Sequence, residues 1–186
     1  MVSIPSLWAP IVLSAVLVFV VSSIVHMALA YHRSDYRPLP REGEALDMLR
    51  GLGLAPGLYT FPHCESPKEM GTPEMLAKYE RGPVGLLTVL PSRPPAMGKH
   101  LAAWFVYCLV IGVFVAYLAG RTLAPGTEYL EVFRVAGTAA LMAYGLGYLV
   151  LPIWWGQPWA TTLKHVFDGL LYALVTAGAF AWLWPA

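Results

Sequence analysis

The chain consists of long apolar runs separated by one long polar stretch, and this pattern predicts four membrane-spanning helices. Apolar runs of about 20 residues, the length that crosses roughly 30 Å of hydrocarbon, cover residues 10–30, 99–120, 129–151 and 159–184. Each run is too long for a strand, and backbone that faces lipid must satisfy its own hydrogen bonds. The expected fold class is therefore an all-α membrane protein, a bundle of four transmembrane helices.

Proline and glycine positions support these boundaries. Gly120 is expected to close the second helix and Pro152 the third, while Pro158 precedes the fourth. Residues 28–30 have the small side chains of a signal-peptide cleavage site. However, Met1–Trp8 contains no Lys or Arg, so we expect a retained first helix.

Residues 31–98 form the polar stretch, and they predict a small α+β insert between helices 1 and 2. Helical spacing covers residues 42–50, and Thr72 followed by Pro73 is a typical helix start for residues 73–81. Residues 58–62 and 84–90 are short apolar runs between Gly and Pro, and we expect them to pair as strands. The expected domains are thus residues 1–30 (first helix), 31–98 (insert) and 99–186 (three further helices).

Composition narrows the class of protein. Hydrophobic residues make up 58% of the chain, charged residues only 12%, and the net charge is +1. Soluble domains carry about 25% charged residues, and nucleic-acid binders need a basic surplus. This argues against a cytosolic globule, a disordered chain and a nucleic-acid-binding protein. The expected partner is the lipid bilayer.

Charge asymmetry predicts the orientation. Four crossings place both termini on one side and the insert on the other. Of the 12 Lys and Arg residues, only Arg121 and Arg134 fall on the side of the termini. Because cytoplasmic segments carry the excess of Lys and Arg, we expect a cytoplasmic insert and external termini.

Polar side chains also gather on the insert side, which carries all five histidines. Ionisable groups inside spans are costly and often functional, so we predict a proton or ligand site at this mouth of the bundle. Its candidate residues are His26, His32, Asp35, His100, Lys164, His165 and Asp168.

Spacing within the helices suggests pairings for these candidates. Lys164 and Asp168 are four residues apart and are expected to pair, and Asp168 also lies within reach of His165. His26 continues a mildly polar stripe formed by Ser14, Val18 and Ser22, which is suited to face another helix. The purely structural alternatives are an interfacial ion pair for Lys164 and Asp168 and an interhelical hydrogen bond for His26.

Two residues of the insert, His63 and Cys64, are weak candidates for a metal site. Imidazole and thiolate are natural ligands of soft metals. However, the chain has no paired cysteine spacing, and a closed zinc site needs four ligands. No cofactor is implied by motif.

Small residues recur at every fourth position in helices two, three and four. Examples are Gly112, Ala116 and Gly120 in the second helix. Such faces let helices approach closely. They would serve either packing within the bundle or association with another subunit.

Several segments together resemble a family of small bacterial membrane proteins with four spans and unknown function. The segments are His32-Arg33-Ser34-Asp35-Tyr36 with Leu39-Pro40, Pro56-Gly57-Leu58-Tyr59, Arg81-Gly82-Pro83-Val84, and the tail from Trp159 to Pro185. The resemblance implies a bacterial inner-membrane location and a four-helix bundle. It implies no catalytic residue, but it draws attention to residues 32–35 and 165–168.

The sequence leaves three functional hypotheses. It holds no phosphate-binding loop, no G-x-S-x-G and no H-E-x-x-H. The leading hypothesis is therefore a non-enzymatic accessory or interaction subunit, which associates with itself or belongs to a larger membrane complex. The alternative is a small proton- or ion-coupled transporter or channel. A weaker alternative is a metal-binding or enzymatic membrane protein.

Overall fold

The computed structural model describes residues 1–186, and the chain is mostly helical. Four helices are long and apolar enough to cross a membrane, and they cover Ile4–Ala28, Met97–Thr122, Tyr129–Trp154 and Trp159–Trp182. The chain divides into two compact units. One comprises Met1–Asp35 with Ala96–Ala186, and the other comprises Tyr36–Pro95.

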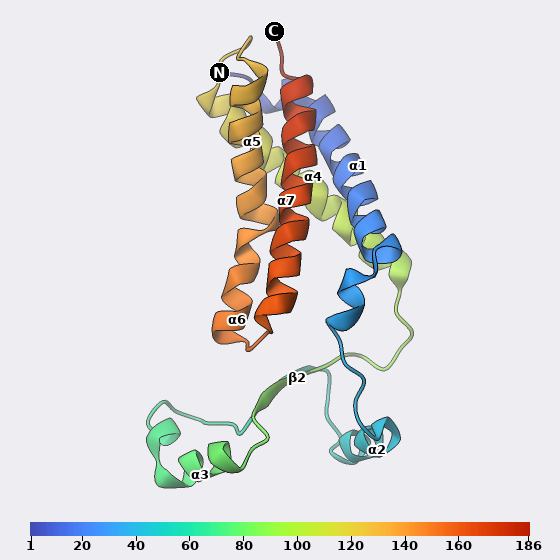
Figure 1. The fold of residues 1–186 in the computed structure, drawn as a ribbon, viewed down its shortest axis with the longest axis vertical. Helices are drawn as coiled ribbons and strands as arrows, with labels where there is room; N and C mark the ends of the chain where they lie inside the picture. The colour runs from blue at the N-terminus through green and yellow to red at the C-terminus, as the bar shows by residue number, and fades with distance from the viewer. The chain divides into compact units, whose positions relative to one another are not determined.

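The first unit contains the four long helices, which run side by side with both chain termini at the same end (Figure 1). Its elements in chain order are η1 (Ile4–Leu7), α1 (Trp8–Ser23), the π turn η2 (Ile24–Ala28), the 3₁₀ turn η3 (Ala30–Ser34), α4 (Met97–Thr122), α5 (Tyr129–Tyr144), η5 (Leu146–Leu149), α6 (Val150–Trp154) and α7 (Trp159–Trp182).

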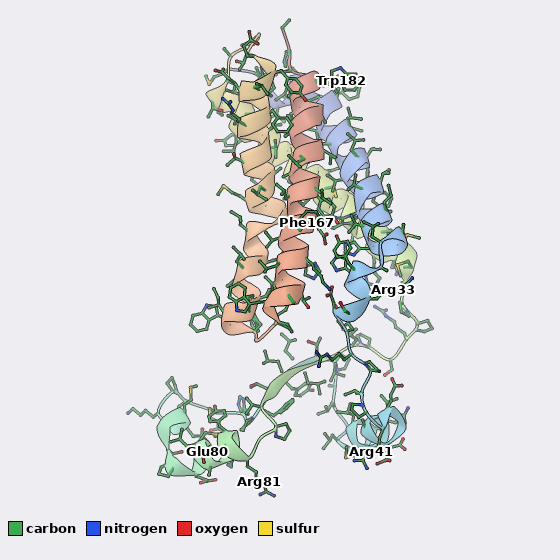
Figure 2. All side chains as sticks on the ribbon, viewed as in Figure 1. Arg33, Arg41, Glu80, Arg81, Phe167 and Trp182 are labelled. Carbon is green, nitrogen blue, oxygen red and sulfur yellow. The ribbon has the colours of Figure 1, made fainter.

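Apolar side chains lie both inside and outside this unit. Leu7, Val115 and Phe180 are fully buried between the helices. Phe167 and Trp182 of α7, both labelled in Figure 2, are exposed. An apolar exterior around an apolar core is typical of helices that face lipid, and it fits the four-span pattern of the sequence.

Small residues bring the helices of this unit into close contact. A Cβ atom on Gly169 of α7 would lie 2.4 Å from the Cα atom of Gly145, and one on Gly112 of α4 would lie 3.2 Å from the Ile11 side chain. A Cβ atom on Gly120 would lie 2.5 Å from the carbonyl oxygen of Val2. Several of the small positions singled out in the sequence therefore pack within the chain.

The third long helix, predicted over residues 129–151, is interrupted near Gly145, one of two glycines within that run. The α-helical hydrogen bonds stop at Gly145, η5 follows, and α6 continues to Trp154. Pro152 does not end this helix, because it occupies the first turn of α6. A proline is tolerated there, since its missing N–H would have no helical partner.

The second unit confirms the pairing of two strands that the apolar runs predict. Strand β1 (Gly57–Phe61) is antiparallel to β2 (Gly85–Val89), with Gly57 opposite Val89 and Phe61 opposite Gly85. The unit also contains α2 (Glu42–Gly51), η4 (Glu69–Gly71) and α3 (Pro73–Arg81).

Helix α3 starts as its sequence predicts. The side chain of Thr72 accepts a hydrogen bond from the Met75 N–H at 3.3 Å, which caps the first turn. Met75 is the one buried side chain of this unit. Arg41, Glu80 and Arg81, labelled in Figure 2, are exposed, as suits a polar segment.

Candidate functional site

The site begins where α1 stops being a regular α-helix. The chain passes through η2, turns at Leu29 in extended conformation (φ −87°, ψ 130°), and forms η3. Hydrogen bonds between the two segments place His32 and Asp35, at the end of this turn, against Lys164 and Asp168 of α7. A π turn widens the helix by one residue and is frequent at functional sites.

His32 lies between two buried carboxylates. Its Nδ1 atom is 2.6 Å from Asp35 Oδ2, and its Nε2 atom is 2.8 Å from Asp168 Oδ2. The side chains of Asp35 and Asp168 are only 4% and 3% exposed. Because a neutral imidazole carries one N–H, these three groups must share an additional proton among them. The hydroxyl of Tyr31 donates to the other oxygen of Asp168.

Lys164 secures the carboxylate of Asp35. Its ammonium group donates to Asp35 Oδ1 at 2.7 Å, to the carbonyl oxygen of Tyr31 at 2.6 Å and to Ser34 Oγ at 2.8 Å. Burial by itself would raise the pKa of Asp35, but the hydrogen bonds from Lys164 and His32 outweigh it and lower that pKa. Asp35 is therefore held as a carboxylate.

The pKa of Tyr31 shifts upward, in the direction opposite to that of Asp35. Burial raises the pKa of its hydroxyl, and the hydrogen bond to Asp168 raises it further, because a phenolate beside a carboxylate is unfavourable. Tyr31 thus remains a hydrogen-bond donor to Asp168.

The pairing of Lys164 differs from the one that helical spacing predicts. Lys164 bonds to Asp35 of η3 rather than to Asp168, four residues along its own helix. Asp168 turns to His32 and Tyr31 instead, and His165 Nδ1 is 3.8 Å from its carboxylate. The reason is tertiary, because the turn through η3 brings Asp35 to Lys164 and brings His32 to Asp168.

Three imidazole rings gather around this pair of carboxylates. The ring centre of His32 lies 4.6 Å from that of His26 and 5.2 Å from that of His165. His165 also stacks on Tyr148 at 4.9 Å. We name the set His26, Tyr31, His32, Asp35, Lys164, His165 and Asp168 the imidazole–carboxylate cluster.

The cluster borders a cavity of about 620 Å³. His26, His165 and Asp168 contribute to its wall, and most of the remaining lining is aromatic or aliphatic: Met27, Met97, Leu101, Trp104, Tyr107, Tyr144, Tyr148 and Tyr172. The indole N–H of Trp104 donates to Ser22 Oγ at 2.9 Å, and the Tyr172 hydroxyl lies 3.5 Å from His26 Nε2. The cavity thus combines an apolar wall with imidazole and carboxylate groups.

His26 meets another helix, as its spacing predicts, because its Nε2 atom lies 3.5 Å from the hydroxyl of Tyr172 in α7, but it is more exposed than the rest of its stripe. Ser14, Val18 and Ser22 of the stripe are buried, but His26 is exposed and lines the cavity. The π turn explains the difference, because its wider turn carries a residue four positions on away from the α-helical stripe.

The other sequence candidates lie apart from the cluster. His100 lines the same cavity, but it makes no side-chain hydrogen bond there. His63 and Cys64 belong to the second unit, where Cys64 Sγ contacts the hydroxyl of Tyr79 at 3.2 Å. Neither belongs to a group of side chains that could share a metal ion.

Sequence reasoning missed the aromatic part of the site. Tyr107, Tyr144 and Tyr172 lie well inside long apolar helices, where a phenol hydroxyl needs a polar partner. Tyrosines that far from the helix ends were a usable signal for the cavity. Tyr31 and Ser34 had no comparable signal, because their roles depend on how η3 folds.

The end of the first unit that carries the termini is packed with apolar side chains. Leu7, Val132, Ala136 and Phe180 are fully buried there. Thr176 Oγ1 is the one buried side-chain polar atom without a partner. Beyond the cluster, the buried polar side chains of α1 and α7 are Ser14 and Thr176, and neither is ionisable.

Two groups of three side chains have the spacing of metal ligands. They are His26, His32 and Asp168, and His32, Asp35 and His165, and in each group the ligand atoms lie within 4.8 Å of one another. Comparison with protein-family models, with curated proteins and with solved structures finds no match to this chain.

Proposed function

We propose that the protein is an integral membrane protein of the bacterial inner membrane that crosses the bilayer four times. The four long apolar helices and their exposed apolar side chains support this proposal. The excess of Lys and Arg outside the terminal side supports a cytoplasmic position for residues 31–98 and external termini.

Within this frame, the proposed activity is binding of a small amphipathic molecule in the cavity. The observation that carries it is a cavity of about 620 Å³ whose largely apolar wall includes His26, His165 and Asp168. Small-molecule sites typically measure about 300–1,000 Å³ and combine apolar walls with a few placed polar groups.

The lining favours a ligand with a flat ring or an alkyl chain. The rings of Trp104 and Tyr107 are 5.5 Å apart and nearly parallel, and Tyr172 meets Trp104 edge-on at 6.0 Å. Such walls stack against planar groups. The imidazoles of His26 and His165 would contact the ligand's polar group.

The transporter hypothesis gains less support than binding does. A cavity at the candidate residues is one of its requirements, but beyond the cluster the buried polar side chains of α1 and α7 are only Ser14 and Thr176, and neither is ionisable. The polar cluster therefore supports a one-sided site rather than a conduction path.

The hypothesis of an accessory subunit also gains less support. One of its motivations is the small-residue faces, yet Gly112, Gly120 and Gly169 each approach another segment of the same chain closely. These glycines are therefore already used in packing within the first unit.

Photo-crosslinking tests the proposed binding. The protein is placed in lipid nanodiscs and irradiated with an alkylated benzophenone, an amphipathic ring compound that forms covalent bonds on illumination. We expect saturable labelling of peptides that contain Leu101, Trp104 or Tyr144, because these side chains line the cavity or are held in its wall.

A pair of variants gives this experiment its control. Ser23→Phe places a ring into the cavity wall, and we expect labelling there to fall several-fold. Val16→Phe adds the same ring to an exposed position of α1 and should leave the labelling unchanged. Labelling that is unsaturable, or that is equal in both variants, contradicts the proposal.

A further inference from the structure

We propose that His26, His32 and Asp168 bind one divalent transition-metal ion. This inference goes beyond ligand binding in the cavity and does not depend on it. It rests on two imidazoles and a carboxylate from two distant segments of the chain, whose ligand atoms all lie within 4.8 Å of one another, and on His165 close to the same carboxylate.

The shortest distance within the cluster already fits shared coordination, and a bound metal would draw the other ligand atoms closer. His32 Nε2 and Asp168 Oδ2 are 2.8 Å apart, and His165 Nδ1 is 3.8 Å from the same oxygen. Two ligand atoms with bonds of about 2.0–2.1 Å to one metal lie about 3 Å apart. His26 joins His32 and Asp168 with all ligand atoms within 4.8 Å.

Lys164 decides which face of His32 would hold the metal. On the Nδ1 face, Asp35 already has the Lys164 ammonium at 2.7 Å, and a second cation there would meet repulsion. On the Nε2 face, Asp168 has no lysine or arginine partner, and its partners are Tyr31 and the imidazoles of His32 and His165. The Nε2 face is therefore the one that offers an uncompensated carboxylate.

Asp35 would orient His32 for this task. Histidines that bind metals usually donate their other ring N–H to a carboxylate, which fixes the ring and its tautomer. Asp35 Oδ2 lies 2.6 Å from His32 Nδ1 and is itself held by Lys164. Asp35 is thus a positioning residue, and His32 presents Nε2 to the metal.

The ligand set selects the class of metal. Imidazoles with one carboxylate suit zinc, iron, cobalt or nickel in the divalent state. Calcium and magnesium prefer oxygen ligands throughout, and the set holds no thiolate. Because His26, His165 and Asp168 also line the cavity, a metal at this place would face the space proposed for the ligand.

Cobalt titration tests the proposal without any assumed activity. The purified chain, treated with a chelator and dialysed, is titrated with Co²⁺, whose visible absorption reports nitrogen and oxygen coordination, and bound zinc is counted by mass spectrometry after Zn²⁺ is added. We expect saturation near one metal per chain. We expect at least about tenfold weaker binding in His26→Ala and in Asp168→Asn, and about 10–100-fold weaker binding in Asp35→Asn.

Controls separate ligand loss from misfolding. His26 is exposed, so its removal does not threaten the packing. Without metal, the thermal unfolding of the His26→Ala variant should match that of the wild type. His63→Ala removes an exposed histidine of the other unit and should bind Co²⁺ normally. Asp35→Asn should also shift the cobalt spectrum, which a purely structural role would not do.

Two results would overturn the inference. One is the absence of a cobalt band together with zinc far below one ion per chain. The other is undiminished binding in His26→Ala and Asp168→Asn. Either result leaves the cavity proposal standing, because benzophenone labelling of the chelator-treated protein measures that site separately.

Discussion

At the scale of single residues, the site depends on charges that are buried but paired. Asp35 is 4% exposed, and the ammonium of Lys164 reaches it at 2.7 Å while also holding the carbonyl of Tyr31. A buried charge that loses its partner costs far more than the pair contributes, because desolvation is no longer offset.

Replacing Lys164 should therefore destabilise the first unit. We expect Lys164→Met to lower the free energy of unfolding by about 2–3 kcal/mol, toward the lower end for a buried pair, because the Lys164 side chain is 24% exposed. Thermal unfolding in detergent, followed by the fluorescence of the tryptophans, measures the effect.

The double variant Lys164→Met with Asp35→Asn identifies the cause. Removing the carboxylate charge together with the ammonium should restore more than half of the lost stability, since no unpaired charge remains. Additive losses in the two single variants would show that Lys164 acts through packing rather than through charge.

At the scale of elements, the crossing of α5 and α7 sets the position of Asp168. Gly169 follows Asp168 directly, and a Cβ atom at Gly169 would lie 2.4 Å from Gly145 Cα and 2.7 Å from the Gly145 nitrogen. Both obstacles are backbone atoms, which cannot rotate away as a side chain can.

The substitution Gly169→Ala should push these helices apart. We expect a loss of about 1–3 kcal/mol in unfolding free energy, with weaker metal binding because Asp168 moves with the helix. Gly178→Ala lies in the same helix, where the nearest atom is the Tyr129 hydroxyl at 4.0 Å. It should be neutral or stabilising by up to about 1 kcal/mol, and equal losses in the two variants would contradict this account.

Local chemistry explains which elements the sequence predicts well. The α3 start depends on Thr72 and Pro73, and each acts within one turn, so the predicted and observed bounds of 73–81 agree. Gly145 and Gly147 indicate an interruption of the third apolar run, but the two glycines do not by themselves show where the helix stops or which helix packs there. The close approach of Gly169, which lies in another helix, is a tertiary fact.

At the scale of the whole molecule, hydropathy predicts the number of long helices and the side on which polar groups gather. The partners within the cluster could not be predicted in the same way. Lys164 reaches Asp35, and His32 reaches Asp168, only because η2 and η3 bend the chain back toward α7. Spacing along one helix carries no information about such a bend.

The proposed orientation predicts how the cysteines react with a charged maleimide that does not cross membranes. Cys64 lies in the second unit and is partly exposed, whereas Cys108 is buried in α4. In spheroplasts we expect no labelling, and in inside-out vesicles we expect one labelled cysteine per chain. The signal should vanish in Cys64→Ser, and labelling of intact spheroplasts would place the insert outside.

The interruption at Gly145 has a mechanical consequence for the cavity. Tyr144 closes α5, and Tyr148 belongs to η5 beyond the break, yet both contribute to the same wall. On an unbroken α-helix, the spacing between these two rings would be fixed by the helix itself. Here they lie on separate pieces joined at Gly145, so the spacing between the two rings is set by the torsion angles of that residue and by its contact with Gly169.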